Sequence, residues 1–342
     1  MELRNFIDGK FIDSISKKNI PVLNPANQKI VGNIDEALDQ EIDLAFQAAK
    51  KAFEKRILVD MDAKEKSRMM RAIAQKLRER KNEGGKILSQ ENGKTIKQCI
   101  GEFEGAADTF DFYAGLTDKI ENKLIPSGKD TLNYVVLEPF GVALQIVPWN
   151  YPVSIFSGMV AQNWIVGNTI VIKPPELCPI SSNFYGQIFE DVGVPKGIIN
   201  IIHGYGEITG RKLVQHPDSD YIVFTGSPEV ASEILKETAD RIVPTHFELG
   251  GKSAAIIYPD ADIDKAVDST VKGIFKPNAG QICVAMSRVI VHPKIKDEYM
   301  TKLVAKTQKL KIGAGDEEGT EVTPLISTDQ MQRVSNYVKS GV

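Results

Sequence analysis

Four short apolar runs, separated by helical segments, constrain the fold of this chain more than any other feature. The runs are rich in β-branched residues, as strands buried on both faces must be, and they lie at 142–147, 169–173, 198–202 and 221–225. The segments between them have helical character and lie at about 153–166, 180–192, 207–215 and 228–239. Short β-α-β units require right-handed crossovers and a parallel sheet, with ligands at the carboxyl ends of the strands. The pattern therefore predicts an α/β fold with a Rossmann-like parallel sheet.

The residues before this alternation predict other elements. Residues 1–38 contain short strand-like pieces and turn signals, which indicate a small sheet or arm. Two amphipathic helices follow, one beginning at an Asp39 cap and one at about Ala63. The segment 120–138 breaks the helical pattern with a Pro-Ser-Gly turn between two extended stretches. A hairpin between helices is poorly placed to join their core.

A second α/β unit begins at about Glu248. It is predicted to contain strands at 253–257 and 288–291 and helices at 262–275, 294–310 and 330–338. We therefore divide the chain into four parts. They are residues 1–119, the hairpin segment 120–138, the α/β alternation 139–247 and the second α/β unit 248–342.

Composition excludes several classes of partner. The chain has 342 residues, 42% of them hydrophobic and 25% charged, with a net charge of −3. That charge is too close to neutral to indicate a nucleic-acid or membrane partner, and the most apolar run, 153–166, is shorter than the roughly 20 residues of a spanning helix.

The three cysteines show neither paired spacing nor a zinc pattern, so no metal is expected. With no signal peptide, they favour a cytoplasmic location.

Two residues suggest covalent chemistry. Gly280, three positions before Cys283, allows a sharp turn before the thiol, and Glu248 precedes the glycine pair Gly250 and Gly251. A thiolate is a nucleophile for a carbonyl carbon, and a nearby carboxylate is a general base for a thiol or a water molecule. A lone cysteine is more often a small buried hydrophobe, and a lone glutamate is more often a surface acid. The motifs that surround Cys283 and Glu248 instead favour a catalytic interpretation of both residues.

The motifs FELGGK (247–252) and GQIC (280–283), in this order, resemble signatures of the NAD(P)-dependent aldehyde dehydrogenase superfamily. The resemblance extends from NFIDGK (5–10) to TPLI (323–326). It implies oxidation of an aldehyde to a carboxylic acid, with Cys283 as the nucleophile of a thiohemiacetal and a thioester and with Glu248 as the general base. It also implies that 1–119 is an N-terminal part of the NAD-binding domain, that 139–247 is the NAD-binding domain proper and that 248–342 is a truncated catalytic domain. The hairpin 120–138 would then protrude from the body and build the interface of a homodimer or homotetramer.

The motif PWNYP (148–152) follows the first buried strand. In isolation Asn150 would be a turn residue or a helix cap. Because the pentapeptide resembles a family motif, we expect the Asn150 amide and the backbone N–H of Cys283 to stabilise the thiohemiacetal oxygen.

The motif KPPE (173–176) follows the second buried strand. A lysine and an acid at a strand end suit the two hydroxyls of an adenosine ribose, although a charged, solvent-exposed turn is an equally good local interpretation. The carboxylate of Glu176 would repel a 2′-phosphate, so NAD is preferred and NADP is possible. The resemblance implies a cofactor site formed by Val147, Trp149, Lys173, Glu176, Gly206, Gly210, Phe224, Ser227, Val230 and Leu249.

Members of the family continue well beyond the point that this chain reaches, so the resemblance indicates a C-terminally truncated member. One alternative is a catalytically impaired fragment that acts as a nucleotide-binding or interaction protein. A CoA-acylating dehydrogenase is less favoured, since such enzymes typically lack the base at Glu248. The segment 153–160 has no cation to bind a substrate carboxylate, and Phe156 and Met159 suit an apolar or mixed small aldehyde.

Overall fold

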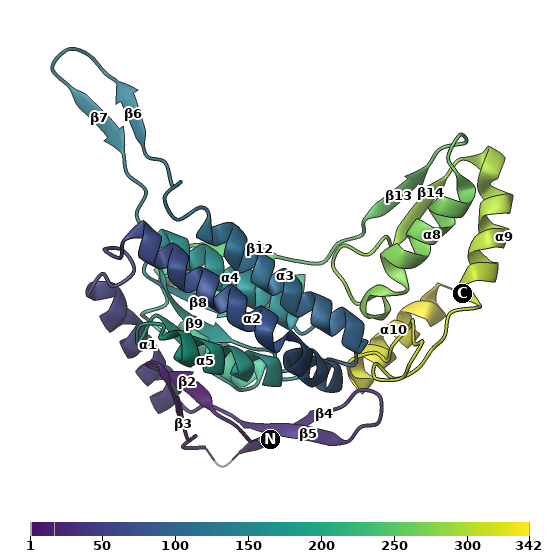
Figure 1. The fold of residues 1–342 in the computed structure, drawn as a ribbon, viewed down its shortest axis with the longest axis horizontal. Helices are drawn as coiled ribbons and strands as arrows, with labels where there is room; N and C mark the ends of the chain where they lie inside the picture. Colours follow the sequence, from purple (N-terminus) through teal and green to yellow (C-terminus); the bar gives the residue numbers. More distant parts are fainter. Residues whose placement is uncertain (1, 17, 342) are drawn as a thin grey trace.

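The computed structural model describes residues 2–16 and 18–341. Its largest part is a body built on a seven-stranded sheet (Figure 1), with the strand order β12-β11-β8-β9-β10-β2-β3. The first five of these strands are mutually parallel, and β2 and β3 extend the sheet as antiparallel strands. The strands are β2 (Asn5–Ile7), β3 (Lys10–Ile12), β8 (Val142–Ile146), β9 (Thr169–Lys173), β10 (Ile199–Ile201), β11 (Tyr221–Thr225) and β12 (Thr245–Glu248).

Helices cover both faces of the sheet, which confirms the prediction of strands buried on both sides. Residues alternate along β9: Ile170 and Ile172 belong to one hydrophobic core, and Val171 belongs to the other. The first core includes α2 (Ala63–Asn92), α3 (Ile96–Ala114), α4 (Pro152–Val166) and α5 (Ile180–Val192). The second core includes α1 (Asp39–Glu54), α6 (Arg211–Gln215) and α7 (Pro228–Thr238).

The strand order reverses beside β8. From β8 the chain continues to β9 and β10 on one side, and β11 and β12 lie on the other side. A crevice at the carboxyl ends of the strands, next to such a reversal, is where doubly wound sheets bind their ligands. The PWNYP segment follows β8, the KPPE segment follows β9, and Glu248 ends β12. The predicted site segments therefore share one edge of the sheet.

The N-terminal region differs in detail from the prediction. The first helix has Leu38 as its N-cap rather than Asp39, and the backbone N–H of Leu38 donates to Glu41 Oε2 at 2.8 Å. Helix α3 was not predicted; its N-cap Thr95 accepts a hydrogen bond from the Gln98 backbone N–H at 3.2 Å. Three further strands form a separate small sheet: β1 (Glu2–Leu3), β4 (Asn19–Leu23) and β5 (Ile30–Asp35).

The expected hairpin is present and projects from the body (Figure 1). It pairs β6 (Lys123–Pro126) with β7 (Leu132–Val135) in antiparallel register, and every residue of both strands is exposed.

A smaller α/β unit stands beside the body (Figure 1). Its parallel strands and two helices enclose a small core around Ile257, Val267 and Tyr299. The elements of this part of the chain are β13 (Ala254–Ile257), α8 (Ile263–Ile274), β14 (Arg288–Val291), α9 (Lys296–Thr307) and α10 (Thr328–Ser340). Short helical turns elsewhere are η1 (Gly206–Gly210), η2 (Ala239–Arg241), η3 (Pro277–Gly280) and η4 (Pro293–Ile295).

Two absences hold for the residues that the structure describes. Within 2–16 and 18–341, no helix has the length and apolar character needed to cross a bilayer. In the same residues, no three His, Cys, Asp or Glu side chains gather as metal ligands would.

The contact between α2 and α3 gives a stability prediction. A methyl group at Gly84 would clash with the ring of Phe103 on α3, whereas one at Gly101 has no neighbouring heavy atom within 4 Å in the described structure. Gly84→Ala should therefore lower the free energy of unfolding by about 1–3 kcal/mol through overpacking. Gly101→Ala should raise it by about 0.5–1 kcal/mol through helix propensity. Urea unfolding of both variants checks this, and equal effects would contradict the packing described.

Candidate functional site

The loop before Cys283 has an unusual backbone. Asn278, Ala279 and Gly280 have φ values of 46°, 52° and 80°, which place three successive residues in the left-handed region. This region is costly for residues other than glycine and persists only where the surroundings enforce it. Here the buried Asn278 side chain donates to the backbone oxygen of Asn150 at 3.1 Å, and Gln281 Nε2 donates to the Asn278 backbone oxygen at 3.0 Å. Cys283 lies exposed at the end of this loop.

The structure brings the two motifs FELGGK and GQIC together. A Cβ atom on Gly251 would lie 2.6 Å from the backbone oxygen of Cys283, so only glycine allows this approach. Glu248 lies three positions earlier, at the end of β12 and in register with Thr225 of β11. The carboxylate and the thiol thus come from two segments whose backbones touch.

Glu248 has a neighbour that the sequence analysis missed. His246 Nε2 lies 3.3 Å from Glu248 Oε1, and both side chains are more than half exposed. The available signal was their spacing, because residues i and i+2 of a strand share one face.

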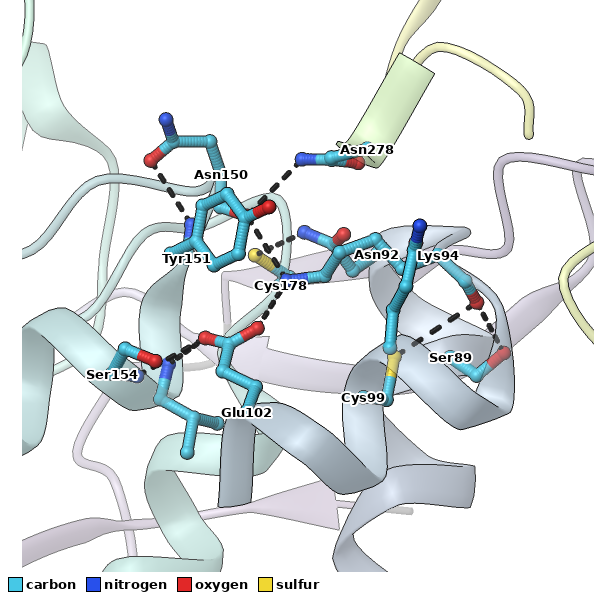
Figure 2. Close-up of polar contacts among 12 residues, drawn as sticks. Ser89, Asn92, Lys94, Cys99, Glu102, Asn150, Tyr151, Ser154, Cys178 and Asn278 are labelled. Atoms are coloured by element: carbon cyan, nitrogen blue, oxygen red, sulfur yellow. Dashed lines mark hydrogen bonds and ion pairs between the residues drawn. The ribbon is translucent and has the colours of Figure 1, made fainter. Parts of the chain in front are cut away.

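Asn150 is held so that its amide nitrogen is available. Its Oδ1 accepts a hydrogen bond from the Tyr151 backbone N–H at 3.0 Å. Figure 2 shows Nδ2 pointing away from Tyr151, and it has no hydrogen-bond partner among the described residues. This is the geometry of a donor that a substrate oxygen can use.

A buried ion pair that was not predicted contacts this segment from the interior of the protein. The side chains of Lys94 and Glu102 are each 1% exposed and contact one another. Burial alone lowers the pKa of Lys94, but the Glu102 carboxylate outweighs this effect, so the pKa is raised and the ammonium stays charged. Figure 2 shows Glu102 beside the beginning of α4, together with Asn150, Tyr151 and Asn278.

The other two cysteines are buried. Burial raises the pKa of the Cys99 thiol to about 12 and that of Cys178 well above its ordinary value. Cys178 Sγ donates to the backbone oxygen of Trp149 at 3.3 Å, and Asn92 Nδ2 donates to the same oxygen at 2.7 Å. Both thiols are inert structural groups, so Cys283 is the exposed thiol of the described chain.

Lys173 and Glu176 form a prearranged pair at the end of β9. Lys173 Nζ lies 3.1 Å from Glu176 Oε2 and donates to the Pro174 backbone oxygen at 3.0 Å. Glu176 Oε1 accepts from the Gly206 backbone N–H at 3.3 Å. Burial alone raises the pKa of Glu176, but Lys173 and backbone N–H groups outweigh it, so the pKa is lowered and the carboxylate is ionised. A donor and an acceptor are therefore ready at one strand end.

The other residues expected to bind the cofactor lie near the same edge of the sheet. Ser227 is the N-cap of α7, and its side chain accepts from the Val230 backbone N–H at 3.3 Å. Gly210 lies against Lys173, with 3.5 Å between Lys173 Cδ and a Cβ built at this glycine. Val147 and Phe224 are buried, Trp149 and Leu249 are half-buried, and Gly206 and Val230 are exposed.

The suggestion that Phe156 and Met159 shape the substrate site is wrong. Phe156 is fully buried and stacks on Tyr185, with 4.4 Å between ring centroids, and Met159 is 6% exposed. Both side chains belong to the core between α4 and the neighbouring helices. The apolar character of α4 thus reflects packing rather than substrate preference.

Comparison with known proteins decides the family. The model of the aldehyde dehydrogenase family matches residues 11–342. This chain belongs to the aldehyde dehydrogenase family. Aminoaldehyde dehydrogenase 1, peroxisomal, of Pisum sativum is 38% identical, with 98% of this chain and 68% of that protein covered. Betaine aldehyde dehydrogenase, chloroplastic, of Beta vulgaris is 34% identical with the same coverage.

Solved structures agree with this result. An NAD⁺ complex of an aldehyde dehydrogenase from Bacillus cereus superimposes with a TM-score of 0.97 at 36% identity, over all of this chain and 70% of that one. This chain therefore spans about two thirds of the length of its relatives. The reaction of this aldehyde dehydrogenase is the NAD-dependent oxidation of an aldehyde. The ionised Glu176 beside a buried ammonium fits the hydroxyls of the adenosine ribose of NAD.

His203 provides a test of the electrostatics at this edge of the aldehyde dehydrogenase. It lies two residues after the end of β10 and is 1% exposed, and its Nε2 lies 3.1 Å from Asn183 Oδ1. Burial first, and then the Lys173 charge, lower its pKa to about 3. The unfolded chain therefore takes up this proton at a higher pH than the folded chain, and the stability that neutral His203 contributes is lost as pH falls from about 6.5 towards 3.

His203→Gln removes this titration. Between pH 7.5 and 5.5, we expect the wild-type free energy of unfolding to fall relative to that of the variant. The steepest slope should approach about 1.4 kcal/mol per pH unit. Urea unfolding at several pH values measures the difference, with His292→Gln in the smaller unit as the control. Parallel pH profiles for the wild type and His203→Gln would contradict a buried neutral imidazole.

Proposed function

We propose that Cys283, Asn150 and Glu248 form the catalytic site of this aldehyde dehydrogenase. The observation that supports it most is the hydrogen bond from Asn278 Nδ2 to the Asn150 backbone oxygen, because it joins the loop before Cys283 to the segment that carries the Asn150 amide. The contact between Gly251 and the Cys283 backbone supports the place of Glu248 in the same site.

In the proposed mechanism, the Cys283 thiolate adds to the aldehyde carbon, and the carbonyl oxygen becomes an oxyanion. The Asn150 Nδ2 group and the backbone N–H of Cys283 stabilise this oxyanion, a contribution of about 3 kcal/mol per well-placed donor. Lys173 and Glu176 would hold NAD at its adenosine ribose, and the bound cofactor would supply the hydride acceptor needed to oxidise the thiohemiacetal to a thioester. Glu248 then takes a proton from a water molecule, which attacks the thioester carbon and releases the carboxylic acid and the thiolate.

We also propose how the chain holds its cofactor. Lys173 donates to one ribose hydroxyl and Glu176 accepts from the other, which favours NAD because the ionised carboxylate repels a 2′-phosphate. Gly206, Gly210 and the N-terminus of α7 with its Ser227 cap leave room for the diphosphate. Val147, Trp149, Phe224, Val230 and Leu249 complete the walls.

The substrate is proposed to be a small aldehyde. No lysine or arginine lies in the segment 153–160, which disfavours an aldehyde that carries a carboxylate. Two relatives are named for aminoaldehydes and betaine aldehyde, so cationic aldehydes belong in the assay panel.

We propose that the protein is a cytoplasmic homodimer or homotetramer. Support for the reducing compartment comes from the three free thiols. Support for assembly comes from the hairpin, where Leu124, Leu132 and Tyr134 are 71%, 74% and 61% exposed. Apolar side chains gathered on a protruding two-stranded ribbon are typical of an interface.

Glu248→Gln tests the roles proposed for Cys283 as nucleophile and Glu248 as general base. If Glu248 activates the hydrolytic water, the variant should release about one NADH per active site and then stall, since its thioester accumulates. Rapid-mixing absorbance at 340 nm measures the burst, and mass spectrometry of the quenched protein detects an acyl group on Cys283. Cys283→Ala should give neither signal, and Glu233→Gln on the exposed side of α7 is the matched control.

Steady turnover by Glu248→Gln at the wild-type rate would contradict its role as base. NADH formation by Cys283→Ala would contradict the covalent mechanism. Binding of NAD without turnover by the wild-type chain would instead favour the alternative of a nucleotide-binding or interaction protein.

The hairpin has its own test. Leu124→Asp combined with Leu132→Asp places two charges on the exposed hairpin and should shift the protein to a monomer in sedimentation velocity. Leu44→Asp, at a residue on α1 that is 47% exposed, should leave the oligomeric state unchanged. Equal sedimentation of all three proteins would rule out the hairpin as the interface.

A further inference from the structure

Lys94 is a buried cation with no part in the proposed mechanism. It follows Gly93 at the end of α2, and its ammonium has three neighbours. It pairs with Glu102, donates to the Asn150 backbone oxygen at 3.0 Å, and lies 4.4 Å from the centroid of the Tyr151 ring. Two of these three neighbours belong to the PWNYP segment.

Glu102 holds the other end of the same stretch of chain. Its Oε1 accepts from the backbone N–H groups of Val153 and Ser154 at 2.9 and 3.1 Å. These N–H groups lie in the first turn of α4, whose N-cap Tyr151 supplies no side-chain hydrogen bond. A carboxylate from α3 therefore replaces the missing cap. The two members of the ion pair, Lys94 and Glu102, therefore hold residues 150–154 in place from the buried side of the segment.

The peptide group between Asn150 and Tyr151 is held on both sides. Its carbonyl oxygen accepts from Lys94 Nζ and from Asn278 Nδ2, at 3.0 and 3.1 Å. Its N–H donates to Oδ1 of the Asn150 side chain at 3.0 Å. If this peptide group rotated, Oδ1 would lose its donor and Nδ2 would point elsewhere. The direction of the Asn150 amide therefore depends on the two donors to the carbonyl.

We propose that Lys94 is a positioning residue for this aldehyde dehydrogenase: through the 150–151 peptide group, it fixes the direction in which Asn150 presents Nδ2 to the oxyanion on Cys283. The inference rests on the proposed roles of Cys283 and Asn150. The competing interpretation is a buried ion pair that serves stability alone. The two differ in whether loss of Lys94 impairs only reactions that form an oxyanion.

Two reagents separate these interpretations. With 4-nitrophenyl acetate, the Cys283 thiolate attacks the ester carbonyl through an oxyanion; an S–C bond forms, the C–O bond breaks, and 4-nitrophenolate leaves. With iodoacetamide, an S–C bond forms as the C–I bond breaks, and no carbonyl oxyanion arises. Lys94→Met should slow acylation at least about 10-fold and leave alkylation within about twofold. Neither reaction requires hydride transfer, so both report on the thiol and the oxyanion donors alone.

The control is Lys66→Met. Lys66 is a buried lysine of α2, 8% exposed, whose side chain has no hydrogen bond or ion pair within the described structure. This variant removes a buried cation in the first turns of α2, 28 positions before Lys94, and should change neither rate. If Lys94→Met does not fold, Asn278→Gly removes the other donor to the carbonyl and tolerates the φ of 46°. It should lower the ratio of acylation to alkylation in the same direction.

A double-mutant cycle completes the test. If Lys94 acts through Asn150, then Lys94→Met should cause no further loss of acylation in an Asn150→Ala background. Additive losses, an equal fall in both reactions, or unchanged acylation in Lys94→Met would overturn the inference while leaving the proposed function intact. Absence of acylation in the wild type, or acylation of Cys283→Ala at the wild-type rate, would overturn the proposed function, and the inference would fall with it.

Discussion

The backbone carbonyl of Asn150 is the point at which three distant parts of the chain meet. Lys94 comes from the connection between α2 and α3, Asn278 comes from the loop before Cys283, and the carbonyl itself follows β8. A buried carbonyl oxygen without a hydrogen-bond donor destabilises the folded state, so the fold requires these contacts. The strained backbone of residues 278–280 is sustained by the same contact. The geometry around the exposed Cys283 thiol therefore depends on the buried hydrogen bonds that Lys94 and Asn278 donate to the Asn150 carbonyl.

The parallel sheet explains why these hydrogen bonds lie at the carboxyl ends of the strands. Because β8, β9, β11 and β12 run in one direction, the residues that follow them gather at one edge. The sheet is covered on both faces, so its strand ends are the places where polar side chains can approach one another without being buried in a hydrophobic core. The smaller α/β unit supplies the thiol, and the backbone contact between Gly251 and Cys283 links it to β12.

Much of this arrangement was predictable from the sequence, for physical reasons that differ between elements. The strands were predictable because burial on both faces leaves a continuous apolar run, as in Thr169–Lys173. The motifs around Cys283 and Glu248 were predictable because glycines and chemistry-bearing residues occur together. Lys94 and Glu102 were not, because a charged residue in the sequence looks like a solvated one until the fold buries it with its partner. Phe156 and Met159 misled because an apolar helix can face either a core or a cavity, and its sequence does not distinguish them.

The central claim is that the Asn150 amide and the Cys283 thiol serve one reacting oxygen. A crystal structure of the chain acylated on Cys283 by 4-nitrophenyl acetate tests this most directly. We predict that the acyl oxygen lies within hydrogen-bond distance of Asn150 Nδ2, at about 2.7–3.2 Å, with Lys94 and Asn278 still bonded to the Asn150 carbonyl. An acyl oxygen that points into solvent, with the Asn150 amide several ångströms away, would contradict the account.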